Sequence, residues 1–414
     1  MNYKKKILKN GMRVIAVPMK DTKAVTVLVL VSTGSKYETK DKNGLSHFLE
    51  HMCFKGTKKR PNSMLINKEL DGLGAYSNAF TGTEYTGYYA KAEAKHLQRI
   101  LDIISDIYLN STFPKADMER EKGVIIQEIR MYEDEPQRKA WVLFDELLHG
   151  DQPAGWSVVG PEKNIIKIKQ EDFINYHKNH YVAKATTLVV SGNCDYKKIF
   201  SDAEKYFTGI STGKKLGKKR VIEKQTSPNL LIKQKDTDQT HIVLGFRAFN
   251  VFDKRVPALT LLSGVLGAGM SSRLFHKLRE EMGVCYYIFT SVDNSTDHGN
   301  FNMAAGVDVK RVAEVVKELL KECKKLTKEL VSPAELRKVK DALIGNLYLG
   351  LETSDSFAMF YGIQEVIKKK KKNPEEIKRQ IEKVTAKDIQ KVAKDIFQNK
   401  KLNLAIIGNI KDKK

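Results

Sequence analysis

The hydrophobic and polar positions near the start of the chain predict a sheet. Apolar runs on both sides of Asn10-Gly11 predict a hairpin over 7–18, because this dipeptide suits a tight two-residue turn. The β-branched run Ala24–Ser32 predicts a buried strand. The Thr- and Tyr-rich stretch over 74–90 is punctuated by glycine and predicts two more strands.

Apolar residues at three- and four-residue spacing predict helices between and after these strands. In the first of them Leu45, Phe48, Leu49 and Met52 form one apolar face, and Gly56 ends it. The predicted helices of this part of the chain are 45–54, 63–73, 94–109, 117–132 and 141–148.

The second half of the sequence repeats the first. The end of one predicted strand, Leu188-Val189-Val190-Ser191-Gly192-Asn193, resembles Leu404-Ala405-Ile406-Ile407-Gly408-Asn409, 216 positions later. Adding 216 to the position of Val25 gives His241, which lies inside another strand predicted over 240–246. A helix predicted over 257–266 follows this strand. Two marks with one offset indicate two copies of one domain.

These elements predict an α+β fold made of two homologous α/β-sandwich domains. A Gly- and Lys-rich stretch of low apolar content, residues 211–229, is typical of a surface linker. We therefore predict a first domain over 1–210 and a second over 230–414.

Composition narrows the class of protein. The 414 residues are 41% hydrophobic and 29% charged, as in ordinary globular proteins. The net charge of +22 indicates either acidic partners or a lysine-rich solvated surface. The four cysteines show no paired spacing, no apolar segment follows the basic N-terminus, and the longest mainly apolar run, 24–31, is too short to span a bilayer. We expect a cytoplasmic protein that does not enter a membrane.

The predicted helix over 45–54 carries two histidines on one face. His47 and His51 are four residues apart, so both can reach one metal ion, and Glu50 lies beside them. The order His-x-x-Glu-His is the reverse of the more common zinc-protease order.

A catalytic zinc site usually has three protein ligands, and a later helix offers candidates for the third. Glu121 and Glu128 are seven residues apart, about two helical turns, and so share one face of the helix predicted over 117–132. Bound zinc lowers the pKa of its water towards about 7, and Glu50 is placed to accept the proton. The pattern predicts a metal-assisted hydrolase.

With these residues the chain resembles the M16 zinc peptidases, the pitrilysin or mitochondrial-processing-peptidase-like family also called inverzincins. The resemblance is carried by three segments: Gly44–Thr57, Asn78–Thr81 and Gly123–Ile129. It implies one Zn²⁺ per chain held by His47, His51 and Glu128, with Glu50 as the catalytic base. It also implies that Glu121 supports the site without binding the ion.

The resemblance continues in the second half, through Leu266–Phe275 and Leu278–Tyr286. It implies that Arg279 and Tyr286 reach the substrate, as suitable donors to the oxyanion of peptide hydrolysis. Asn78, Ala79 and Phe80 resemble the edge strand against which family substrates lie.

The family architecture implies one half of a clam-shell, with two halves enclosing a chamber for small or unfolded peptides. Because the zinc motif and the Arg/Tyr element are both on this chain, a homodimer is the simplest assembly, although a partner of different sequence is open.

Two other functions are compatible with parts of the sequence. A non-catalytic or assembly subunit of the same fold would be expected to carry a broken motif, and here every motif residue is present. A basic nucleic-acid-binding protein rests only on the net charge of +22, without an aromatic-interleaved basic stretch. We therefore predict a zinc endopeptidase with no nucleic-acid partner.

Overall fold

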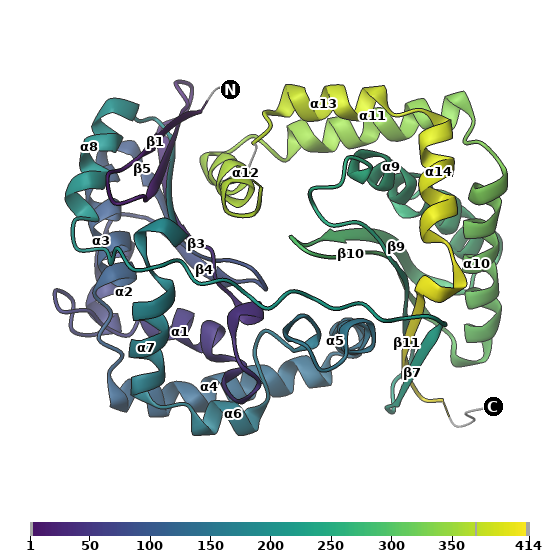
Figure 1. Ribbon diagram of the computed structural model, residues 1–414, viewed down its shortest axis with the longest axis horizontal. Coiled ribbons are helices and arrows are strands. Elements are labelled where there is room, and N and C mark those ends of the chain that lie inside the picture. The colour runs from purple at the N-terminus through teal and green to yellow at the C-terminus, as the bar shows by residue number, and fades with distance from the viewer. Residues whose placement is uncertain (1–2, 369–370, 411–414) are drawn as a thin grey trace. The chain divides into compact units, whose positions relative to one another are not determined.

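The computed structural model describes residues 3–368 and 371–410, which form two compact units. Unit 1 contains residues 3–129, 157–219, 350–368 and 371–373, and unit 2 contains residues 130–156, 220–349 and 374–410. Each unit is built on one mixed sheet covered by helices (Figure 1). In the part of the chain described, no helix combines the length and the apolar character needed to cross a membrane.

Unit 1 contains a six-stranded sheet in the order β1-β2-β6-β3-β5-β4. The predicted hairpin is confirmed, since β1 and β2 pair as antiparallel strands, and β2 then pairs parallel to β6. All other pairs are antiparallel, and β4 is an outer strand. The strands are β1 (Lys4–Ile7), β2 (Arg13–Pro18), β3 (Ala24–Val31), β4 (Tyr76–Thr81), β5 (Thr86–Glu93) and β6 (Thr186–Gly192).

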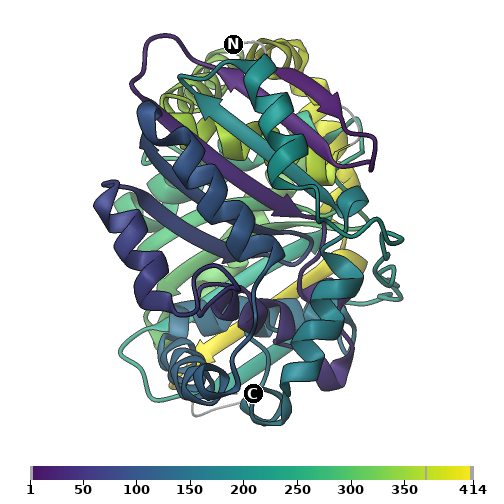
Figure 2. The same cartoon turned by 90° about the vertical axis from the view of Figure 1, so that its left-hand side faces the viewer.

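Four of the five helices predicted in this part of the chain belong to unit 1, with small differences at their ends. The fifth, predicted over 141–148, lies in unit 2 and starts earlier than predicted, at Pro136, because proline suits the first turn of a helix. Figure 2 looks onto the face of the sheet that α3 and α8 cover. The helices are α1 (Leu45–Cys53), α2 (Ser63–Gly72), α3 (Leu97–Leu109), α4 (Lys115–Asp134, whose last turn belongs to unit 2), α6 (Glu162–Lys167), α7 (Gln170–His180), α8 (Tyr196–Tyr206) and α12 (Ser354–Ile367).

Strand β3 shows why the sequence reads as a continuous apolar run. Val27 and Val29 face the cluster that contains α1 and α3, whereas Leu28 and Leu30 face a second cluster. That second cluster is closed by Phe357 and other residues of α12. Because helices cover both faces of the sheet, both sets of alternating side chains are buried.

Unit 2 repeats this plan with five strands in the order β7-β11-β8-β10-β9. Helix α5 covers one face, where Phe144 packs beside Val243, and the other helices cover the opposite face. The strands are β7 (Asn229–Gln234), β8 (Thr240–Arg247), β9 (Cys285–Asn294), β10 (Gly299–Val307) and β11 (Leu402–Gly408). The helices are α5 (Pro136–His149), α9 (Val256–Gly267), α10 (Val312–Lys328), α11 (Pro333–Leu349), α13 (Pro374–Lys383) and α14 (Ala386–Ile396).

The predicted duplication is confirmed strand by strand. Adding 216 to both bounds of β2, β3 and β6 gives the bounds of β7, β8 and β11. The pairing also agrees, because β2 runs parallel to β6 and β7 runs parallel to β11. The two sheets are therefore copies of one design.

One helix from each side of the predicted linker, residues 211–229, packs in the other unit. A single division of the sequence at that linker did not predict this exchange. Helix α5 precedes that segment in the chain yet packs on β11 and β8 of unit 2. Helix α12 follows it yet packs on β3 and β6 of unit 1 (Figure 1). Between 212 and 228 the chain forms neither helix nor strand, and the units divide between residues 219 and 220.

Candidate metal centre

Helix α1 presents a buried apolar face and a polar face. The predicted apolar residues Leu45, Phe48, Leu49 and Met52 are all buried in the core of unit 1. Helical spacing then places His47, Glu50 and His51 together on the other side. The core thus fixes the direction in which these three side chains point.

A buried carboxylate anchors the start of α1. Glu38 accepts hydrogen bonds from the backbone N–H of Gly44 at 2.9 Å and of Ser46 at 2.6 Å, and from the amide of Asn43 at 2.9 Å. It therefore satisfies donors that the first helical turn leaves unpaired. Burial raises the pKa of Glu38 to about 7 despite these bonds.

The structure brings the three predicted ligands together. His47 Nε2 lies 3.6 Å and His51 Nε2 lies 3.8 Å from Oε2 of Glu128, which extends from α4. The ligand atoms of the three residues all lie within 4.8 Å of one another. Within residues 3–368 and 371–410, no other group of three or more His, Cys, Asp or Glu side chains comes this close.

This donor set fits zinc in chemistry and spacing. Two imidazole nitrogens and one carboxylate oxygen are the ligands of many catalytic zinc sites. With bonds of about 2.0–2.1 Å in a tetrahedral arrangement, ligand atoms would be about 3.4 Å apart. The separations of 3.6 Å and 3.8 Å are close to that value.

Glu121 supports His51 from outside the donor set. Its Oε1 accepts a hydrogen bond from Nδ1 of His51 at 2.9 Å, and its Oε2 pairs with Nζ of Lys55 at 2.6 Å. Burial opposes ionisation of Glu121, but these two hydrogen bonds outweigh it and lower its pKa. Because an ionised carboxylate only accepts, Nδ1 of His51 carries the proton and Nε2 is left for a metal.

The two imidazoles differ in their electrostatic surroundings. Burial, reinforced by the charge of His51, lowers the pKa of His47 to about 4, which keeps this ring neutral as metal binding requires. Burial also acts to lower the pKa of His51, but the hydrogen bond to Glu121 and the surrounding carboxylates raise it overall.

Glu50 lies beside the donor set and is held by a residue of the sheet. The hydroxyl of Thr81, at the end of β4, donates a hydrogen bond to Oε2 of Glu50. Burial raises the pKa of Glu50, and the bond from Thr81 reduces this effect. The half-buried carboxylate interacts electrostatically with His51 and Glu128, and the bond from Thr81 orients it.

The other predicted site residues lie on an edge strand and in unit 2. Asn78, Ala79 and Phe80 belong to β4, the outer strand of its sheet. In unit 2, Arg279 lies in a π-helical segment and donates a hydrogen bond to the carbonyl oxygen of Tyr286. The guanidinium carbon is 5.4 Å from the centre of the Tyr286 ring, and this tyrosine is 71% exposed.

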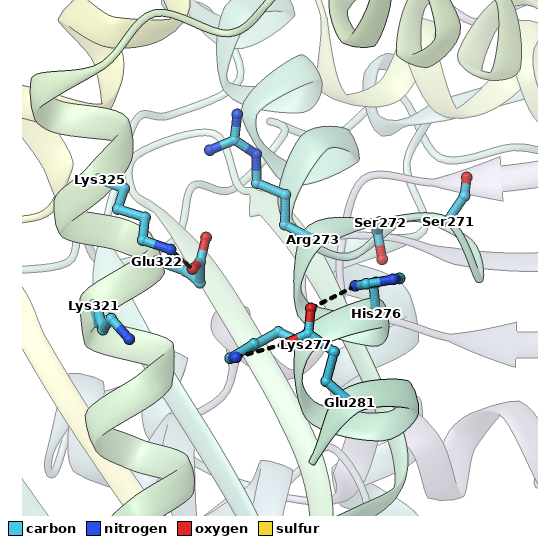
Figure 3. A pocket seen from close by; sticks show the side chains of 9 residues that line it. All are labelled: Ser271, Ser272, Arg273, His276, Lys277, Glu281, Lys321, Glu322 and Lys325. Carbon is cyan, nitrogen blue, oxygen red and sulfur yellow. Dashed lines mark hydrogen bonds and ion pairs between the residues drawn. The ribbon is translucent and has the colours of Figure 1, made fainter. Parts of the chain in front are cut away.

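Unit 2 also contains a cavity of about 440 Å³ with many charged side chains (Figure 3). Each of its four lysine and arginine side chains is paired with a carboxylate, and two of these carboxylates, Glu318 and Glu335, lie outside the lining. The pairs are Arg273 with Glu335, Lys277 with Glu281, Lys321 with Glu318 and Lys325 with Glu322.

Three residues around the site were not singled out by the sequence. Lys55 is four residues after His51, just beyond the end of α1, and Thr81 is the last residue of the segment 78–81, so their positions in the sequence could have indicated both. Glu38 gave no signal, because its contact with the first turn of α1 depends on how the loop before the helix folds.

Known proteins resemble this chain along nearly its whole length. Residues 13–161 match the family described as Insulinase (Peptidase family M16), and residues 167–343 match the Peptidase M16 inactive domain. The uncharacterized zinc protease YmxG of Bacillus subtilis is 31% identical over 389 residues, 94% of each chain. An uncharacterized zinc protease of Rickettsia felis is 34% identical over 413 residues, 98% of each chain.

Two solved structures share the fold. A protease from Helicobacter pylori superposes with a TM-score of 0.90 at 24% identity, covering 98% of this chain and 99% of that one. A peptidase M16 inactive domain from Pseudomonas fluorescens gives a TM-score of 0.91 at 17% identity, covering 99% and 98%. The matches to both halves and the relatives that span nearly the whole sequence show that this chain belongs to peptidase family M16.

Proposed function

We propose that this protein is a zinc-dependent endopeptidase that hydrolyses small or unfolded peptides. The observation that carries the proposal is the approach of His47, His51 and Glu128 to within 4.8 Å of one another, with Glu50 on the same helix as both histidines. The relatives of Bacillus subtilis and Rickettsia felis, which are named zinc proteases, support the choice of metal.

Each residue of the site has a separate task in this proposal. Zinc, when bound, polarises the scissile carbonyl and lowers the pKa of water. Glu50 accepts the proton of the attacking water and passes it to the leaving amine. Arg279 and Tyr286 donate hydrogen bonds to the oxyanion that forms at the scissile carbonyl. The outer strand β4 pairs with the peptide backbone through Asn78–Phe80.

Cleavage of an internally quenched fluorescent peptide tests the proposal. We expect cleavage by the purified protein, its loss with 1,10-phenanthroline, and its recovery when Zn²⁺ is added back. A closely related isomer that chelates poorly, 1,7-phenanthroline, serves as the control. Cleavage that continues at full rate after zinc has been removed, as verified by metal analysis, would exclude a zinc peptidase.

Glu121→Gln should weaken zinc binding without abolishing it. The amide oxygen of glutamine can still accept a hydrogen bond from Nδ1 of His51. The substitution removes the negative charge of Glu121, which makes this imidazole a better ligand and which pairs with Lys55. Loss of such a supporting group typically lowers metal affinity about 10–100-fold. Competition with a fluorescent chelator measures the affinity. The control is Glu119→Gln on the exposed side of α4, and equal affinities for both variants would contradict the role of Glu121.

We further propose a homodimer in which Arg279 and Tyr286 of one subunit serve the zinc site of the other. Mixing Glu50→Gln chains with Tyr286→Phe chains should then restore activity, because each mixed dimer regains one intact site. Random exchange would give about a quarter of the wild-type activity, since half of the dimers are mixed and each has one of two sites.

The mixture needs a control that forms dimers but no intact site. Glu50→Gln chains mixed with chains carrying both substitutions provide it, because every site then lacks Glu50. Subunit exchange is followed by mass measurement with chains of two sizes. Absence of recovery despite complete exchange would show that the sites are not shared between subunits.

A further inference from the structure

Thr81 occupies a special position in unit 1, at the last residue of the outer strand β4. Its backbone pairs with Thr86 of β5, and the five residues before it pair in the same antiparallel ladder. The ladder therefore fixes the backbone of Thr81 although the strand lies at the edge of the sheet.

Alternation along β4 directs the side chain of Thr81 towards α1. Ala79 packs against the core cluster that contains the apolar face of α1, while Phe80 packs against the opposite cluster closed by α12. Since side chains alternate along a strand, Thr81 shares the face of Ala79. Its hydroxyl accordingly reaches the helix that carries the motif and donates to Oε2 of Glu50.

Thr81 is the one hydrogen-bond partner of the Glu50 carboxylate among residues 3–368 and 371–410. If this bond is removed, no other described residue holds the carboxylate by a hydrogen bond. A glutamate side chain rotates about three bonds, so an unheld carboxylate would spread over several rotamers. The bond occupies Oε2 and leaves Oε1 to receive a proton. One hydroxyl thus selects both the rotamer and the oxygen that can act as base.

We propose that Thr81 is a positioning residue that holds Glu50 in its proton-accepting orientation and links it to the strand proposed to bind substrate. This inference rests on the proposed function, in which Glu50 is the base. Phe80 and Thr81 are neighbours, so the strand that pairs with the peptide also sets the direction of the base. Thr81 itself exchanges no proton with the substrate.

Three substitutions at this position test the role of the hydroxyl. Thr81→Val keeps the shape and removes the hydroxyl, and we expect kcat to fall about 10–100-fold, the usual worth of a hydrogen bond to a charged group. KM should change less than about threefold and zinc content should stay at the wild-type level, because neither substrate nor metal depends on this bond. Thr81→Ser should recover most of kcat. If the valine variant is unstable, Thr81→Ala replaces it.

Thr86→Val is the matched control. Thr86 faces Thr81 across the ladder, and its hydroxyl donates to the carbonyl oxygen of Thr33 and not to Glu50. Thr86→Val loses a buried hydrogen bond of the same sheet. A purely structural effect would therefore lower kcat of Thr86→Val and of Thr81→Val by a similar factor. We expect kcat of Thr86→Val to remain within about twofold of wild type.

A double-mutant cycle with Glu50→Gln separates this inference from the proposed function. If Thr81 acts through Glu50, adding Thr81→Val to Glu50→Gln should leave the residual rate unchanged. An equal loss in both backgrounds, a serine variant as slow as the valine variant, or a wild-type kcat in Thr81→Val would each overturn the role of Thr81. Full activity in Glu50→Gln would instead overturn the proposed function.

Discussion

Glu50→Gln should lower kcat for peptide cleavage by about 10²–10⁴-fold while zinc stays bound, because general-base catalysis contributes an effect of that size. The glutamine can still accept the hydrogen bond from Thr81, so the side chain keeps its place, but it cannot take up a proton. Steady-state cleavage of a quenched peptide gives kcat, and metal analysis of the same sample gives the zinc content.

A second substitution at this position distinguishes loss of the base from disturbance of the site. Glu50→Asp keeps a carboxylate but withdraws it by one methylene, so we expect an activity between those of wild type and the glutamine variant. If zinc is lost from the glutamine variant, Glu50 belongs to the ligand set rather than to the proton-transfer step.

The helix that carries the motif could be predicted because its information is local. Spacings of three and four residues identify both the buried face of α1 and the polar face with His47, Glu50 and His51. The duplicated strands could also be predicted, since β6 and β11 keep similar sequences at corresponding positions. Periodicity alone left Glu121 and Glu128 as equal candidates for the third ligand. The choice of Glu128, and with it the approach of α4 to α1, came from the spacing found in the family.

The exchange of α5 and α12 could not be predicted in this way. Periodicity shows that Phe357 and Tyr361 share one face of a helix, but it does not show which of two homologous sheets that face will cover. Both sheets present similar apolar faces, and sequential neighbours are the default expectation for packing. The choice depends on contacts such as that of Thr26 with Ser354, 328 residues apart.

The hydrogen bonds that orient the motif could not be predicted from the sequence either. Glu38 and Thr81 reach α1 from a loop and from an outer strand, and each contact is set by the packing of those elements. A pattern identifies the residues that touch a metal because their spacing is constrained. Residues that orient them can come from any neighbouring element, so their positions follow no fixed spacing.

Glu128→Ala should remove zinc from the protein and abolish cleavage with it. Glu128 Oε2 is the atom that both imidazole Nε2 atoms approach, at 3.6 Å and 3.8 Å, so its loss leaves two ligands where a catalytic site needs three. We expect the zinc affinity to fall by more than the ~10–100-fold anticipated for Glu121→Gln, which changes only a supporting group.

Thermal unfolding with added zinc provides a measurement that does not depend on activity. A ligand that binds only the folded state stabilises it by about 2.7 kcal/mol when its concentration is 100 times Kd, so Tm of the wild type should rise with zinc. Tm of Glu128→Ala should stay constant over the same range, whereas Glu119→Gln on the exposed side of α4 should follow the wild type. A wild-type zinc response in Glu128→Ala would remove this carboxylate from the ligand set and require the third ligand to come from another residue.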